Sequence, residues 1–181
     1  MNRFSLLLVF TVILSCKPQL DKVEDELYAC FTNSLSQKEI QKLNAVSKAY
    51  ETYLIDQKVL ESNDAKSYWN FYSKIAESGT FEFDNDFNFS EKTDFLTRES
   101  LEAAQAQLDC YSQIFQSELY LESKQHQLQK EIQSLRKHRV TPKIIAQTTI
   151  EILSVDDFEF EYNRLVTLLF IETFDETYKH P

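Results

Sequence analysis

Apolar residues recur at every third or fourth position along most of the chain, which is the spacing of one face of an amphipathic helix. Near the start, this face is formed by Leu20, Val23, Leu27, Phe31 and Leu35. The pattern predicts a first helix over residues 20–35. Short polar stretches separate this segment from those that follow, as in helices joined by short connections.

End signals predict two further helices. Ser36 and Glu39 form the Ser-x-x-Glu pattern of a capping box, so a second helix should begin here and end near Ser62. Asp64 is a suitable N-cap for a third helix. Gly79 fits just beyond its end, because glycine readily adopts the left-handed conformation that closes many helices.

The segment 80–95 departs from the helical pattern. Phe81, Phe83, Phe87 and Phe89 alternate with acidic or amide residues. A period of two would give a strand one apolar face. The alternatives are a short pair of strands, or a loop whose phenylalanines fill the interior of a bundle.

The longest helical pattern runs over residues 97–138. An apolar stripe with helical spacing is formed by Leu101, Ala104, Leu108, Tyr111 and Phe115, and is continued by Ile114, Leu121, Leu128, Ile132 and Leu135. The second half is very polar and has only a narrow apolar seam, as in an exposed coiled-coil-like arm. Such an arm packs either on its own bundle, which is the default expectation, or on a partner.

The C-terminal region predicts one or two more helices. Thr141 followed by Pro142 is an N-cap with proline at the first helical position. Residues 148–153 are rich in β-branched side chains, so a strand is the alternative there. Ser154 and Asp157 are expected to open the last helix, which is apolar nearly all round. A helix of that kind is usually central and buried.

The chain contains one glycine and three prolines in 181 residues. Tight hairpins, phosphate-binding loops and dinucleotide-binding turns all need glycine at special positions. We therefore predict an all-α domain over residues 20–181, a single bundle of about five to six helices with one long helix or helical arm. No internal repeat or linker divides it.

The first 15 residues have the composition of a secretory signal. Arg3 gives a positive start, and residues 4–14 are almost entirely apolar. An apolar run of eleven residues is much shorter than the roughly 20 residues that span a bilayer. A signal peptide over residues 1–15 is therefore favoured over a transmembrane helix.

The end of this signal, Ile13-Leu14-Ser15-Cys16, resembles the lipobox of bacterial lipoproteins. Leu14 is bulkier than usual at its position. The resemblance implies cleavage before Cys16 and a diacylglycerol on its sulfur, so that residues 16–19 form the lipidated cysteine and a short tether. Such a tether would hold the domain within about 15 Å of the membrane. Ordinary secretion is the alternative.

Removal of the signal makes the chain more acidic. Without Arg3, 18 basic and 29 acidic side chains remain, a net charge of −11. This charge argues against nucleic acid and anionic lipid head groups as partners. It would favour a basic protein, although an acidic surface also serves simple solubility.

Cys30 and Cys110 are the only cysteines of the predicted domain. Outside the cytoplasm they are candidates for a disulfide bond. Both lie near apolar helical faces, so free thiols in the core are the alternative. A catalytic thiol is disfavoured, because the chain has no Cys-x-x-Cys motif and no histidine near either cysteine in the sequence.

Known catalytic and metal-binding patterns are absent from the sequence, so we predict no catalytic residue, metal or cofactor. Glu122 and His126 are better interpreted as a solvated pair one helical turn apart. Asp84 and Asp86 resemble the start of a calcium loop, but phenylalanine occupies the positions that require glycine and glutamate.

Aromatic residues at helical spacing on the second and third helices could line a cleft, although such residues more often belong to the core. They are Tyr50, Tyr53, Trp69 and Tyr72.

In general layout the chain is similar to small, uncharacterised helical lipoproteins of Bacteroidetes-type Gram-negative bacteria. The Ser-Cys-Lys junction, the early cysteine before a capped helix, and Thr-Pro before an apolar C-terminal helix carry this resemblance. Lys17 stands where the enteric signal for inner-membrane retention has aspartate. The analogy therefore indicates the outer membrane, with its face left open.

These observations lead to three hypotheses. The first is a non-enzymatic, membrane-anchored module that binds another envelope protein. The second is an acidic inhibitor or immunity-type protein that neutralises a basic hydrolase or toxin, for which charge complementarity would speed association. The third is a ligand-binding or enzymatic helical bundle that uses the aromatic cleft.

Overall fold

The computed structural model describes residues 22–81, 83–97, 101–135 and 140–179. The predicted signal, Cys16 and its tether lie outside these ranges. Every regular element within them is helical, which confirms the all-α prediction. None of the described helices combines the length and the apolar character needed to cross a membrane.

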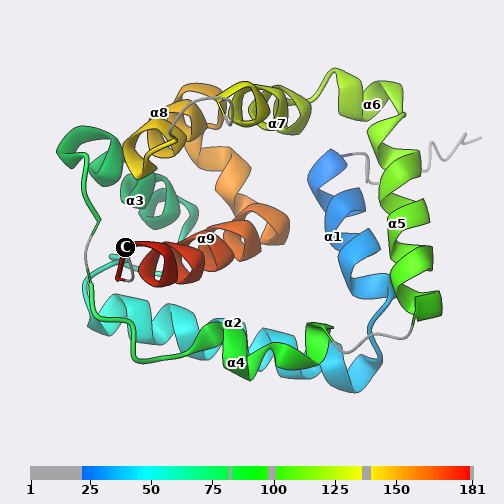
Figure 1. Ribbon diagram of the computed structural model, residues 1–181, viewed down its shortest axis with the longest axis horizontal. Helices are drawn as coiled ribbons and strands as arrows, with labels where there is room; N and C mark the ends of the chain where they lie inside the picture. Colours follow the sequence, from blue (N-terminus) through cyan, green and yellow to red (C-terminus); the bar gives the residue numbers. More distant parts are fainter. Residues whose placement is uncertain (1–21, 82, 98–100, 136–139, 180–181) are drawn as a thin grey trace, which may run out of the picture.

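Helix α9 (Glu161–Lys179) runs through the middle of the molecule, with the other helices around it (Figure 1). On one side lie α3 (Ala65–Ser78), α8 (Pro142–Ile152) and the 3-10 helix η2 (Val155–Glu159). Below it in Figure 1 lie α2 (Gln37–Asp56) and α4 (Phe89–Lys92). On the other side, α5 (Leu101–Phe115) lies outside α1 (Val23–Asn33).

The apolar side chains form two buried clusters. The larger one joins α2, α3, α4, α8, η2 and α9, and it includes the fully buried rings of Tyr50, Tyr68, Phe89 and Phe158. The smaller one joins α1, α5 and α6 (Glu118–Leu121) and consists of Val23, Leu27, Cys30, Ile114 and Tyr120. We call these the main core and the α1–α5 cluster.

The second and third helices begin where the sequence predicts. The Ser36–Glu39 capping box is formed, with the Ser36 amide donating to Glu39 over 2.8 Å. Asp64 accepts a hydrogen bond from the Ser67 amide at the start of α3, and Gly79 closes that helix with φ of 77°. These ends form as predicted because capping depends on residues that are neighbours in sequence.

The predicted end of the second helix near Ser62 is wrong, because α2 ends at Asp56. Lys58 adopts a left-handed conformation with φ of 60°. The amides of Val59 and Leu60 then both donate to the Leu54 carbonyl, and the two side chains are buried. Burial of these apolar side chains in the main core competes successfully with continuation of the helix.

Among the described residues of 80–95 there is no strand; a loop leads into α4 and then into the 3-10 helix η1 (Asp94–Thr97). The Tyr50 ring stacks on Phe87 and on the fully buried Phe89. The alternative in which phenylalanines of a loop fill the bundle is therefore correct.

The prediction of one continuous helix over 97–138 is wrong. Its described part forms α5, α6 and α7 (Lys124–Leu135). Ser117 accepts a hydrogen bond from the Tyr120 amide, and Ser123 accepts one from the His126 amide. Each serine thus caps a new helix. The described residues contain nine α-helices, more than the predicted number.

The predicted polar arm, which forms α7 in the structure, packs on its own bundle, in agreement with the default expectation. Helix α7 lies against α8, and Gln125 is buried. Helix α8 continues through Ile152, so the alternative strand over 148–153 does not form. Thr141 caps α8, and proline occupies its first turn.

The expected start of the last helix needs a correction. Ser154 and Asp157 form a capping box on η2, and α9 begins only at Glu161. Helix α9 is central, as predicted, with Leu168 and Ile171 almost fully buried. Its apolar surface is nevertheless not fully covered, because Val166 is 41% and Leu169 is 40% exposed.

Candidate functional site

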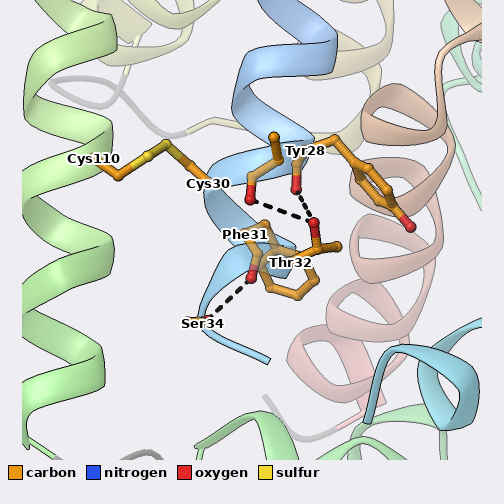
Figure 2. The surroundings of a disulfide bond; sticks show 7 residues. Tyr28, Cys30, Phe31, Thr32, Ser34 and Cys110 are labelled. Carbon is orange, nitrogen blue, oxygen red and sulfur yellow. Dashed lines mark hydrogen bonds between the residues drawn. A yellow bond between two sulfur atoms is a disulfide. The ribbon is translucent and has the colours of Figure 1, made fainter. Parts of the chain in front are cut away.

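A disulfide bond between Cys30 and Cys110 connects α1 to α5. The two Cα atoms are 5.8 Å apart, and the bond crosses directly between the two helices (Figure 2). The two cysteines are 80 positions apart in the sequence. In the chain-entropy model, closing a loop of that length contributes about 4 kcal/mol to the free energy of unfolding. The bond therefore fixes α5, which packs chiefly on α1 and α6, to the helix nearest the predicted anchor.

The outer surface of α5 and α6 exposes several large apolar side chains, which we call the α5–α6 edge. Its members and their exposed fractions are Leu108 (63%), Phe115 (39%), Leu119 (39%) and Leu121 (50%). The segment 101–122 contains four acidic residues and no lysine, arginine or histidine. The edge thus lies on a segment that carries only negative charge, although Lys22 and Lys124 line the same surface hollow as Leu119.

A cavity of about 230 Å³ lies between α7, α8 and α9, with its floor on α3 and η2. Six aromatic side chains contribute to its wall: Tyr72, Phe115, Tyr120, Phe158, Tyr162 and Phe170. No described side chain that lines this cavity carries a charge. Most of its exposed lining is apolar, so it is suited to a neutral guest. We call it the α7–α9 cavity.

Hydrogen bonds organise the floor of the α7–α9 cavity. The Tyr72 hydroxyl lies 3.3 Å from Thr167 Oγ1, and Thr167 donates to the Asn163 carbonyl over 2.7 Å. Burial raises the pKa of Tyr72 to about 12, although the hydrogen bond with Thr167 lowers it. The hydroxyl therefore stays protonated at neutral pH and acts as a fixed donor.

Gln125 joins three helices at the inner end of this cavity. Its Nε2 donates to Glu24 Oε1 on α1 over 3.1 Å and to Asn163 Oδ1 on α9 over 2.9 Å. All three side chains are buried. This amide is the polar connection between the α1–α5 cluster and the main core.

The first turn of α7 is held by an ion pair. Lys124 Nζ lies 2.5 Å from Asp157 Oδ2, and the Ser154 amide donates to the same oxygen over 2.6 Å. Desolvation raises the pKa of Asp157, but the hydrogen bonds from Lys124 and Ser154 outweigh it and leave that pKa below its ordinary value. Asp157 is therefore ionised at neutral pH.

The four aromatic residues predicted as a cleft do not line one site. Tyr50 is fully buried, and the Tyr53 hydroxyl donates to the Asp84 carbonyl over 2.8 Å. The Trp69 indole donates to the Leu153 carbonyl over 3.3 Å. Only Tyr72 reaches the α7–α9 cavity. The prediction fails because Tyr50 and Tyr53 on α2 share Phe87 as a neighbour, whereas Trp69 and Tyr72 on α3 contact Leu153 and α9.

The interpretation of Glu122 and His126 as a pair one turn apart on a single helix is wrong, because α6 ends at Leu121 and α7 begins at Lys124. His126 Nδ1 lies 2.8 Å from the Leu121 carbonyl, and its ring lies beside Tyr120. The part of the chain that the structure describes contains no group of three histidine, cysteine or acidic side chains able to hold a metal.

The sequence analysis missed the residues that shape the α7–α9 cavity. Gln125 and Asn163 are polar residues within helical patterns, and their burial has no sequence signature. Val166 gave a partial signal, because a helix that is apolar nearly all round must find cover on every side. The sequence could not show that cover is missing near Val166.

Comparisons with protein-family models, with curated proteins and with solved structures found no match to this chain.

Proposed function

We propose that this protein is a lipid-anchored protein of the cell envelope, at the outer membrane, that acts by binding another protein close to the membrane. The α5–α6 edge is the proposed contact surface. The observation that carries the proposal is the exposure of four large apolar side chains on this edge. Exposed apolar surface of this kind is typical of interaction sites.

The position of the edge relative to Cys16 supports a membrane-proximal role. Val23, the first residue of α1, lies seven positions after Cys16 in the chain. Fully extended, these seven steps span about 25 Å. The Cys30–Cys110 bond then couples α1 to α5. A lipid on Cys16 would therefore keep the edge close to the bilayer surface.

The charges around the edge indicate the chemistry of the partner. Asp109, Glu118 and Glu122 are exposed, and segment 101–122 carries no positive side chain. A partner with an apolar patch surrounded by lysine and arginine would complement this surface. Anionic lipid head groups would be repelled. An inhibitor of a basic hydrolase is a narrower form of the same proposal.

Site-specific photo-crosslinking in native envelopes tests the proposal. A photoreactive residue at Leu108 or Leu121 should give one crosslinked protein, whereas the same residue at Thr52, exposed on α2, should not. Raising the salt concentration should weaken the crosslink, because it screens complementary charge. The Cys16→Ala form should lose most of it.

Three results would contradict the proposal. Equal crosslinking from Thr52 would show that the edge is not the contact surface. Crosslinking to lipid alone would identify the membrane itself as the occupant. An unchanged crosslink in the Cys16→Ala form would remove the anchor from the mechanism.

A further inference from the structure

We infer that the α7–α9 cavity is a binding site for a small neutral aromatic molecule that carries one hydrogen-bonding group. Phe115 belongs both to this site and to the α5–α6 edge, but no other member of the edge lines the cavity, and the inference does not depend on the proposed protein partner. The size of the cavity, its uncharged wall and the polar groups within it all favour such a ligand.

The volume of the cavity fits a ligand of one or two rings. At about 230 Å³ it is larger than the engineered cavity of roughly 150 Å³ that binds benzene. It is smaller than the cavities of about 300 Å³ and more that take drug-sized ligands. A two-ring molecule is therefore the appropriate size.

The composition of the wall selects for a neutral aromatic guest. The centroid of the Tyr72 ring lies 5.8 Å from that of Phe158 and 5.5 Å from that of Phe170, so the cavity has an aromatic side. A charged ligand would lose its hydration here without gaining an opposite charge from the lining. A flat apolar molecule would gain ring contacts without that cost.

The cavity also leaves apolar surface exposed that a ligand would cover. Val166 on α9 is 41% exposed and Phe115 on α5 is 39% exposed, and both belong to the lining. Covering them removes apolar surface from water, which favours binding.

Two polar groups can recognise a ligand hydroxyl. Tyr162 belongs to the cavity lining, and none of the hydrogen bonds between described residues uses its hydroxyl. Burial, together with nearby Tyr120 and Glu24, raises the pKa of this hydroxyl. The Gln125 amide nitrogen is committed to Glu24 and Asn163, and its carbonyl oxygen remains to accept. A hydroxyl both accepts and donates, so it matches this pair.

The test uses the full chain in detergent micelles and 1-naphthol as the probe. Amide resonances of Thr149 and Thr167, two lining residues, are followed by NMR during the titration. They should shift saturably, whereas the amide of Leu108 should not. The anion 1-naphthoate should cause much smaller shifts. It partitions less into the micelles than 1-naphthol does, so its free concentration is higher and a smaller shift reflects weaker binding.

Two variants locate the site. Val166→Trp places bulk at the exposed mouth without overpacking the core, and it should abolish the shifts, whereas Leu108→Trp on the α5–α6 edge should leave them unchanged. Tyr162→Phe should weaken the affinity for 1-naphthol about fivefold, which is the effect expected from the loss of one hydrogen bond. Binding of 1-methylnaphthalene, which lacks the hydroxyl, should be unaffected by that variant.

The inference would be overturned if 1-naphthol gave no saturable shift at Thr149 and Thr167, if 1-naphthoate bound equally well, or if Val166→Trp, shown by circular dichroism to be folded, still bound the probe. Equal loss of 1-naphthol and 1-methylnaphthalene binding in Tyr162→Phe would refute the assigned role of the hydroxyl. None of these results bears on the crosslinking from the α5–α6 edge, so the two proposals fail separately.

Discussion

The main core and the α1–α5 cluster achieve burial by different means. In the main core, fully buried aromatic rings from distant segments contact one another, as Tyr50 does with Phe87 and Phe89. The α1–α5 cluster has few buried side chains, and a covalent bond between Cys30 and Cys110 joins its two long helices. A small apolar cluster gives little stabilisation by itself, so a disulfide is valuable there.

The same difference explains where the two proposed sites lie. The helices of the main core bury most of their apolar side chains but leave Val166 and Leu169 of α9 exposed, whereas α5 presents one face to α1 and leaves Leu108 and Phe115 exposed. The α7–α9 cavity lies where the two regions meet around Gln125. Binding surfaces thus occur where this fold leaves apolar residues without cover.

The largest expected effect comes from removing a ring from the main core. Phe89→Ala should lower the free energy of unfolding by about 4 kcal/mol, because Phe89 is fully buried and stacks on Tyr50. Urea unfolding followed by circular dichroism measures this loss. A change below about 1 kcal/mol would show that the α4 segment does not contribute to the core.

Removing the disulfide should destabilise the protein by up to about 4 kcal/mol and should act mainly on the α1–α5 cluster. In Cys30→Ser/Cys110→Ser, hydrogen exchange of amides in α1 and α5 should accelerate more than exchange in α3 and α9. Ala49→Ser, an exposed change on α2, is a control for introducing a hydroxyl. Uniform acceleration in all four helices would contradict the distinction between the two regions.

Breaking the polar connection between the regions should cost about 2 kcal/mol. Gln125→Leu keeps the side-chain size but removes the donor that serves Glu24 and Asn163, which remain buried. The unfolding free energy of Gln125→Leu is the quantity to measure. Glu24→Gln in the same background should recover part of the loss, because it removes a buried charge. If the unfolding free energy did not recover, the Glu24 carboxylate would be solvated in the absence of Gln125.

The smallest effect concerns pH. The pKa of Asp157 is lowered in the folded state, so its ion pair with Lys124 stabilises the fold above the unfolded value of about 3.9 and is lost as pH falls through the folded pKa. Because Lys124 is half exposed, the contribution should be only about 1 kcal/mol. Urea unfolding between pH 7 and about pH 3 should show a weaker pH dependence for Asp157→Asn than for the wild type. Equal slopes would exclude this pair as a contributor.

Local signals account for the part of the fold that the sequence predicts well. Ser36, Asp64, Gly79 and Thr141 act at helix ends through residues only a few positions away. The near absence of glycine also excludes most alternatives to helices. The division of 97–138 into three helices was missed, because the serine caps compete with a helical pattern that continues through them.

The sequence alone determined that this chain is helical and where α2, α3 and α8 begin, and it predicts an N-terminal lipid anchor at Cys16. Only the tertiary structure decided which aromatic residues are core, which apolar side chains remain exposed on α5 and α6, and where a cavity opens beside α9. The physical reason is the range of the interactions. Helix formation and capping act between residues close in sequence, whereas burial depends on whether segments far apart in the chain happen to cover one another.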